Sequence, residues 1–218
     1  MRAGSRGQGM ELDAEPTSET LTSVAFKLVL LGSSDVGKSS LVLRYVRGDF
    51  RETISTTGCA YFSHRVNIQG RIIDFEIWDT AGQERYQSLC HLYFRGANAA
   101  LLVYDITSKE TFNRAQFWLQ ELQKYVFSGD MVIALVGNKS DLQADVSSQD
   151  AEAFAEQKKL LFMETSAKTG KGVNEVFGEV ARNLLTMEQH KKDKQLRKNF
   201  TLEETHPSSV RQRCCNFQ

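Results

Sequence analysis

A glycine-rich pattern near the start of the chain, Gly32-Ser33-Ser34-Asp35-Val36-Gly37-Lys38-Ser39, has the form of a phosphate-binding loop: Gly, four arbitrary residues, then Gly-Lys-Ser. The apolar run Phe26 to Leu31 precedes it and predicts a buried strand, whereas Leu41 to Tyr45 predicts the start of a helix. The motif needs this context, because backbone N–H groups at a helix N-terminus can then surround phosphates. We therefore expect an α/β domain that binds a nucleotide at this loop.

Individual residues of the loop have predicted roles. Lys38 is expected to reach the β and γ phosphates and to act in catalysis, and the Ser39 hydroxyl to bind Mg²⁺. The phosphates of the nucleotide are expected to contact Ser34, Asp35, Val36, Gly37, Lys38, Ser39, Ser40 and, further along the chain, Gly82.

Composition limits the class of protein. The chain has 218 residues, of which 41% are hydrophobic, and a formal net charge of zero, so it fits one globular domain and offers no basic footprint for nucleic acid. No apolar run approaches the length of a membrane span, and the first residues lack a signal-peptide core. The cysteines show neither metal nor disulfide spacing, which indicates a reducing compartment.

Segment patterns divide the chain into three parts: a disordered leader at residues 1–23, a folded domain at 24–187 and a flexible tail at 188–218. The continuous apolar runs in the domain are typical of strands buried on both faces of a parallel sheet. One antiparallel hairpin is expected around Gln69-Gly70. These elements predict a three-layer α/β fold with a mostly parallel, six-stranded sheet and helices on both faces.

Two details of the pattern can be checked directly. Thr107 and Glu110 have the spacing of a capping box at the start of a helix over residues 112–126. The histidines suggest no metal site, and each is expected to be a solvated surface residue: His64, His91, His190 and His206.

The segment Asp79-Thr80-Ala81-Gly82-Gln83 follows a predicted strand and therefore lies at the carboxyl end of the sheet, beside the phosphate-binding loop. Asp79 can hold Mg²⁺ there, through water, while the Gly82 amide meets a γ phosphate. Gln83 can orient an attacking water, which makes it a candidate catalytic residue.

A second polar segment, Asn138-Lys139-Ser140-Asp141, follows another buried strand. The Asp141 carboxylate can accept hydrogen bonds from guanine N1–H and the 2-amino group, and adenine has neither donor. The amides of Ser166-Ala167-Lys168 could meet guanine O6. The predicted guanine site therefore consists of Asn138, Lys139, Asp141, Ser166, Ala167 and Lys168.

These motifs resemble those of the small GTPases of the Ras superfamily, and within them the Rab family, over about Phe26 to Met187. The stretch from Cys90 to Ala100 is most similar to the endosomal branch, including its member in epithelial transcytosis. The Rab-like segments are Phe75 to Glu84, Arg85-Tyr86, Tyr93 to Ala97, Leu102 to Thr107 and the terminal Cys214-Cys215-Asn216-Phe217-Gln218.

The resemblance implies a G domain of the P-loop GTPase type and further site residues. Thr56 would belong to the first switch and join Ser39 and Asp79 as a Mg²⁺ ligand; Thr57 is the alternative, and Gly58 favours Thr56. Tyr61, Trp78 and Tyr93 would form the surface that effectors recognise, and Cys214 and Cys215 would carry prenyl groups.

The implied activity is slow hydrolysis of GTP to GDP by a monomeric switch, accelerated by an activating protein. Expected partners are an exchange factor, a GTPase-activating protein, a GDP dissociation inhibitor, the prenylation escort machinery, GTP-dependent effectors and, through the prenyl groups, a membrane; nucleic acid is not expected. The expected location is the cytoplasmic face of endosomal membranes, with cycling through the cytosol.

Three alternatives stay open. Asp35 places a carboxylate in an anion-binding loop where most relatives carry a small neutral residue, so the protein could be a GTP-dependent binding module that seldom hydrolyses. A P-loop kinase for a small molecule is the other rival. From Lys191 to Arg213 seven basic residues stand against three acidic ones, which fits either contact with anionic lipid or a solvated spacer.

Overall fold

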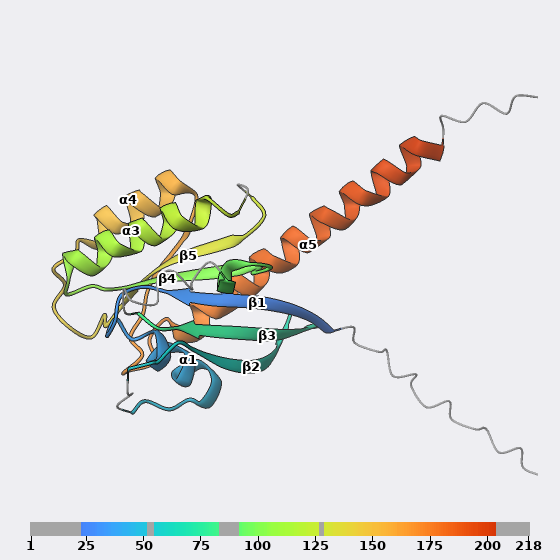
Figure 1. The fold of residues 1–218 in the computed structure, drawn as a ribbon. Helices are drawn as coiled ribbons and strands as arrows, with labels where there is room; N and C mark the ends of the chain where they lie inside the picture. Colours follow the sequence, from blue (N-terminus) through green and yellow to red (C-terminus); the bar gives the residue numbers. More distant parts are fainter. Residues whose placement is uncertain (1–22, 52–54, 83–91, 127–128, 204–218) are drawn as a thin grey trace, which may run out of the picture.

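The computed structural model describes residues 23–51, 55–82, 92–126 and 129–203. Within them, six strands form one sheet in the order β2-β3-β1-β4-β5-β6 (Figure 1). The strands are β1 (Ser23–Leu31), β2 (Cys59–Ile68), β3 (Arg71–Thr80), β4 (Ala99–Asp105), β5 (Val132–Asn138) and β6 (Leu161–Glu164). The helices are α1 (Lys38–Arg47), α3 (Lys109–Gln123), α4 (Ser148–Lys158) and α5 (Val173–Glu203).

The strand directions confirm the expected fold. Strands β3, β1, β4, β5 and β6 run parallel, and β2 is antiparallel to β3. The turn between β2 and β3 has Gln69 and Gly70 at φ 54° and 80°, and the Gly70 N–H donates to Asn67 Oδ1 at 3.0 Å. Two consecutive left-handed residues match the twist of a two-residue hairpin.

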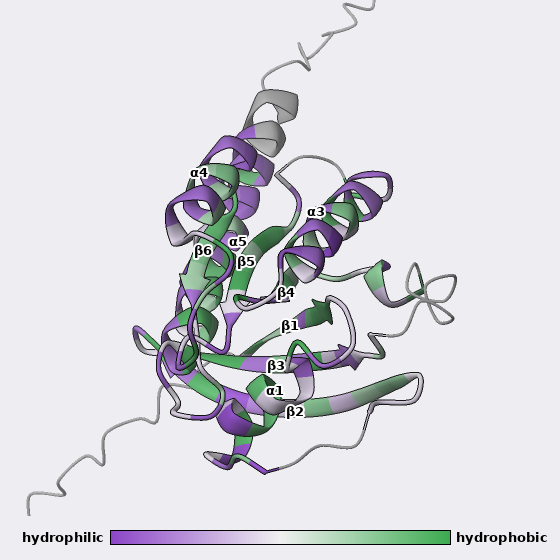
Figure 2. Cartoon of the chain, turned by 90° about the vertical axis from the view of Figure 1, so that its left-hand side faces the viewer, coloured by the Kyte–Doolittle hydropathy of each residue, from purple (hydrophilic) through white to green (hydrophobic). Residues whose placement is uncertain are grey.

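Helices cover both faces of the sheet. On one face Leu28 and Leu30 of β1 belong to a core cluster with α1 and α5. On the other face Val29 and Leu31 pack in a cluster with α3 and α4. All four side chains are fully buried, which is why this strand is a continuous apolar run. Hydrophobic colour in Figure 2 is accordingly concentrated along the strands.

The expected boundary between the domain and the tail, at residues 187 and 188, lies inside α5, and residues 188–203 continue this helix. Packing against the core ends near Met187, but the helix runs to Glu203 and projects from the domain (Figure 1). Good helix formers continue this stretch, and Glu188 pairs with Lys192 at 2.6 Å and with Arg71 at 2.8 Å. None of the described helices is long and apolar enough to cross a membrane.

Two local predictions are corrected. Helix α3 is capped by Ser108, whose side chain accepts from the Thr111 N–H, so the capping box does not start at Thr107. The leader was expected to reach residue 23, but Ser23 is the first residue of β1; residues 1–22 lie outside the described part.

His64 is not a solvated surface residue. Its ring contacts Tyr45 edge-on, with centroids 4.6 Å apart, and Tyr45 stacks on Phe177 at 3.8 Å. Burial raises the pKa of Tyr45 to about 12 and lowers the pKa of His64. The alternation along β2 turns His64 inward toward α1 and α5, a placement that composition could not indicate.

Candidate nucleotide-binding site

A cavity of about 270 Å³ lies where the loops leave the carboxyl ends of the strands. Most of the predicted site residues line it, although they come from separate loops. They are Ser34, Asp35, Gly37, Lys38, Ser39, Ser40, Thr56, Gly82, Asn138, Lys139, Asp141, Ala167 and Lys168. The structure therefore brings the predicted phosphate, metal and guanine residues into one site.

The phosphate-binding loop leaves the N-terminus of α1 open to an anion. Gly37 is the N-cap residue at φ 94°, no side chain caps the helix, and its first turn carries no acidic residue. A Cβ on Gly37 would lie 2.3 Å from the Asn138 side-chain nitrogen, so only glycine fits. The N–H groups of the first turn and the positive end of the helix dipole are thus available to phosphate.

Lys38 is held against the loop that it follows. Its Nζ donates to the carbonyl oxygens of Gly32 at 3.0 Å and Ser33 at 2.7 Å, and the residue is only 5% exposed. A buried ammonium is costly unless negative charge or acceptors surround it. This position suits a cation that would face phosphates bound in the same cavity.

Three oxygen-bearing side chains converge beside Lys38. Ser39 Oγ lies 2.9 Å from Thr56 Oγ1 and donates to Asp79 Oδ2 at 2.5 Å, while Thr56 Oγ1 lies 3.4 Å from the same oxygen. Thr57 is exposed, so the geometry favours Thr56 as the threonine of this cluster.

The cluster fits a hard divalent cation. Asp79 Oδ1 is buried and has no hydrogen-bond partner, and burial raises the pKa of this carboxyl while Ser39, Lys38 and Thr56 oppose that rise. No group of three His, Cys, Asp or Glu side chains forms a metal site among the described residues. Mg²⁺ needs none, since it commonly binds through one or two carboxylates, waters and substrate phosphates.

Gly82 closes the phosphate end of the cavity. A Cβ there would lie 2.3 Å from the Ser34 backbone nitrogen, so glycine permits this close approach. Val36, which was expected to contact phosphate, is fully buried and does not line the cavity. The candidate catalytic residue Gln83 lies outside the described residues, as do Cys214 and Cys215.

Asn138 joins the guanine loops to the phosphate-binding loop. Its Nδ2 donates to the Val36 carbonyl oxygen at 2.8 Å, and its Oδ1 accepts from the Ala167 N–H at 3.1 Å and from the Thr165 hydroxyl at 3.3 Å. The residue is 2% exposed. Asn138 therefore acts as a brace that sets the spacing of three loops.

Asp141 is fixed for base recognition by Ser166, whose hydroxyl donates to Asp141 Oδ1 at 2.6 Å. Ser166 does not line the cavity. Its N–H donates to the Lys171 carbonyl oxygen, and the Ala167 N–H is taken by Asn138, so two amides predicted to meet guanine O6 are engaged elsewhere. These two bonds hold the loop in its conformation.

Sequence reasoning missed four lining residues, Phe50, Ser55, Thr80 and Leu142, and also Arg44, which lies beside the cavity. Phe50 lines the cavity with 44% of its surface exposed, and the Arg44 guanidinium lies 6.0 Å from its ring centroid. Arg44 also donates to the carbonyl oxygens of Ala167, Lys168 and Gly48 at 2.7 to 2.8 Å. The aromatic residue alone in a polar loop was the only signal in the sequence.

The three predicted effector aromatics form a row. Tyr61 and Trp78 have ring centroids 5.4 Å apart, and Trp78 and Tyr93 are 6.0 Å apart. Tyr61 is 54% exposed, and Lys27 Nζ lies 5.0 Å from the Trp78 ring centroid. Their contact makes one continuous aromatic surface beside β2 and β3.

Comparison with known proteins places this architecture in a family. The family model described as the Ras family matches residues 27–186. Ras-related protein Rab-17 of Homo sapiens is 57% identical over 162 residues, which are 73% of this chain and 76% of that protein. Ras-related protein Rab-17 of Mus musculus is 57% identical over 161 residues, 73% of this chain and 75% of that protein.

The chain belongs to the Ras family of small GTPases, in its Rab branch. It binds GTP, hydrolyses it to GDP and serves as a switch in membrane trafficking. Prenylation and membrane association are typical of Rab proteins.

Proposed function

We propose that this protein is a Mg²⁺-dependent GTP switch of endosomal, transcytotic vesicle traffic. Thr56 carries the proposal, because its hydroxyl lies 2.9 Å from Ser39 Oγ and so links the first switch loop to the phosphate-binding loop. A loop that gains a ligand contact only when the γ phosphate is present changes its order with the state of the nucleotide. The resemblance of residues 90–100 to the endosomal branch supports the choice of membrane.

The residues of the chain have defined roles in this proposal. Ser39, Thr56 and Asp79 would hold Mg²⁺, which would neutralise charge on the phosphates of the nucleotide. Lys38 and the amides of the phosphate-binding loop orient the same phosphates, and Gln83 places the attacking water. Asp141 would select guanine, because an acceptor that the bound base encloses and that adenine leaves unpaired would favour guanine by about 10⁴-fold.

Regulators and membrane attachment complete the cycle. No arginine is among the described residues that line the cavity, which supports acceleration by an activating protein. An exchange factor and GTP-dependent effectors would act at the switch loops and at the Tyr61, Trp78 and Tyr93 surface. Two prenyl groups on Cys214 and Cys215 would hold the protein stably on the cytoplasmic face of endosomes, and a dissociation inhibitor would return it to the cytosol.

The nucleotide that co-purifies with the full chain tests the proposal. The protein is denatured, the nucleotide is identified by chromatography, and hydrolysis is then followed in a single turnover of loaded GTP. GDP and slow hydrolysis are expected. Bound GTP without hydrolysis would favour the binding module that seldom hydrolyses, and transfer to an acceptor other than water would favour a kinase.

An Asp141→Asn variant tests base selection in the same protein. The amide replaces an acceptor by a donor, so GDP binding should weaken while xanthosine diphosphate, with a carbonyl in place of the 2-amino group, should bind more tightly than it does to the parent. Asp145→Asn, at an exposed position, is the control. Equal GDP affinity in the parent and the Asp141 variant would contradict the assignment.

A further inference from the structure

Asp105 is a buried carboxylate beside the guanine loop. It is the last residue of β4, pairs in register with Asn138 of β5, and is 8% exposed. Asp105 does not line the cavity, whereas Lys139, one residue after Asn138, does. A buried charge costs free energy unless it is paired, so the partners of Asp105 show what this carboxylate does.

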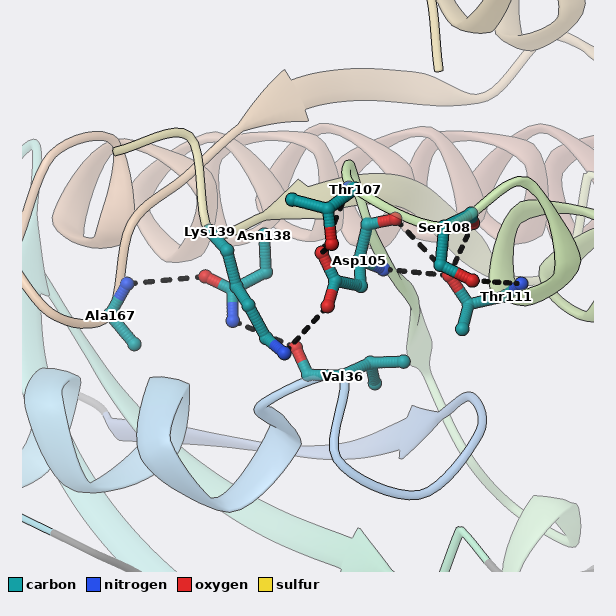
Figure 3. Close-up of polar contacts among 8 residues, drawn as sticks. All are labelled: Val36, Asp105, Thr107, Ser108, Thr111, Asn138, Lys139 and Ala167. Atoms are coloured by element: carbon teal, nitrogen blue, oxygen red, sulfur yellow. Dashed lines mark hydrogen bonds and ion pairs between the residues drawn. The ribbon is translucent and has the colours of Figure 1, made fainter. Parts of the chain in front are cut away.

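Both oxygens of Asp105 are engaged (Figure 3). Oδ2 lies 2.6 Å from Lys139 Nζ, and Oδ1 accepts the Thr107 N–H at 2.9 Å and the Thr107 hydroxyl at 2.8 Å. Burial alone would raise the pKa of Asp105, but the hydrogen bonds from Lys139 and Thr107 outweigh it and lower the pKa. The carboxylate is thus ionised at neutral pH and matches the charge of the lysine.

The first turn of α3 holds the backbone of Asp105 in place. The Asp105 N–H donates to Thr111 Oγ1 at 3.0 Å, and the Thr111 hydroxyl bonds in turn to the Ser108 carbonyl oxygen at 2.8 Å. Figure 3 shows Asp105 between Lys139 on one side and Ser108 and Thr111 on the other. The lysine head is therefore paired with a residue at the end of β4 whose backbone is fixed by α3.

The anchor fixes the part of Lys139 that lines the cavity. Its backbone is left-handed at φ 69°, an uncommon conformation for a residue with a side chain, and the head is drawn to Asp105. Lys139 lines the cavity, and its aliphatic stem runs between these two fixed ends. A side-chain stem that is already ordered before the ligand binds increases affinity, because it loses less conformational entropy on binding.

We propose that Asp105 is a positioning residue that holds the stem of Lys139 against the guanine base and thereby slows nucleotide release. The inference rests on the proposed function, in which this cavity binds guanine nucleotide. Asp105 acts on GDP and GTP alike, so it changes how long a nucleotide stays bound and not how fast bound GTP is cleaved.

The test measures release of a fluorescent GDP analogue from the full chain, chased by unlabelled GDP. Asp105→Asn keeps the shape of the side chain and removes its charge, and release should become about tenfold faster, as for loss of one charge-assisted hydrogen bond. Single-turnover hydrolysis of loaded GTP should not change. Asp74→Asn is the matched control, because Asp74 pairs with Arg65 at 2.6 Å on the exposed side of β3.

Two further variants show whether Asp105 acts through Lys139. In a Lys139→Ala background, Asp105→Asn should add little, since the group that it positions is gone. Asp105→Glu restores the charge and should release the analogue more slowly than Asp105→Asn. An undiminished effect of Asp105→Asn in the Lys139→Ala background would overturn the proposal.

The outcomes separate the inference from the proposed function. A parent protein that holds no GDP overturns both. A parent that holds GDP, together with a folded Asp105→Asn variant that releases it at the parental rate, overturns the inference alone. If Asp105→Asn does not fold, Thr107→Val replaces it in the test, because it removes one hydrogen-bond donor to Asp105 Oδ1. Release of the GDP analogue by that variant at the parental rate would overturn the inference.

Discussion

The side-chain nitrogen of Asn138 donates a 2.8 Å hydrogen bond to the carbonyl oxygen of Val36, 102 residues earlier in the chain. This bond ties the guanine loops to the phosphate-binding loop. The distance between the two ends of a bound nucleotide is therefore set by the protein before any ligand arrives.

Asn138→Ala should destabilise the protein as well as weaken GDP binding. Alanine would leave the Val36 carbonyl and the Ala167 N–H without their partner, and each is buried in the wall of the site. We expect a loss of about 2 to 4 kcal/mol in the free energy of unfolding, measured by urea denaturation. Asn174→Ala, at an exposed position of α5, should change it little; equal losses in the two variants would contradict the role of Asn138.

The carboxyl-edge site was predictable because its chemistry is local in sequence. Asp79 and Asn138 each follow a buried strand, and parallel strands bring such residues to one edge. The contacts of Arg44 with Ala167 and Lys168 span more than 120 residues and leave no local signal. For the same reason the sequence predicted no role for Asp105: its partner Lys139 is brought near only by the pairing of β4 with β5.

Smaller errors have physical causes too. Thr107 and Ser108 are both good N-cap residues. Asp105 accepts hydrogen bonds from the N–H and the hydroxyl of Thr107, so Ser108 caps α3 instead. The tail was interpreted from its polarity, which excludes core packing. Polarity does not exclude a solvated helix that continues one already formed, since extending a helix needs no new nucleation.

Arg44→Lys should speed GDP release although it keeps the charge. The Arg44 guanidinium donates to Ala167, Lys168 and Gly48 from three nitrogens, and a lysine ammonium cannot reproduce that planar geometry. Release of a fluorescent GDP analogue should accelerate by about tenfold, as for a net loss of one to two hydrogen bonds. Arg47→Lys, in the same helix, should release at the parental rate, and acceleration in both variants would point to a general effect on α1.

Asp35 should shorten the lifetime of the bound nucleotide. Its side chain is exposed at the lip of the cavity, and its backbone has φ 60°, a conformation that favours glycine. Asp35→Gly removes both the like charge near the phosphates and the backbone strain, and GDP release should slow by about fivefold.

Asp35→Asn separates the two causes, because asparagine has nearly the same shape and left-handed preference as aspartate but carries no charge. If repulsion dominates, the Asn and Gly variants should both slow release in stopped-flow measurements. If strain dominates, only glycine should do so. Parental release rates in both variants would remove Asp35 as a determinant of exchange.

His64 should make the folded state sensitive to acid. Burial lowers its pKa in the folded protein below the ordinary value of 6.5, so the unfolded chain binds more protons as the pH falls past that value. The stability associated with neutral His64 is therefore complete above about pH 6.5 and is lost progressively as the pH falls toward the folded pKa.

His64→Phe keeps a ring edge against Tyr45 and cannot be protonated, so the free energy of unfolding of this variant should fall less than that of the parent between about pH 7.5 and about pH 5. Urea denaturation at each pH measures that difference, with His190→Gln as the control because His190 is exposed on α5. Parallel profiles for the parent and His64→Phe would show that the packing of His64 against Tyr45 does not resist protonation.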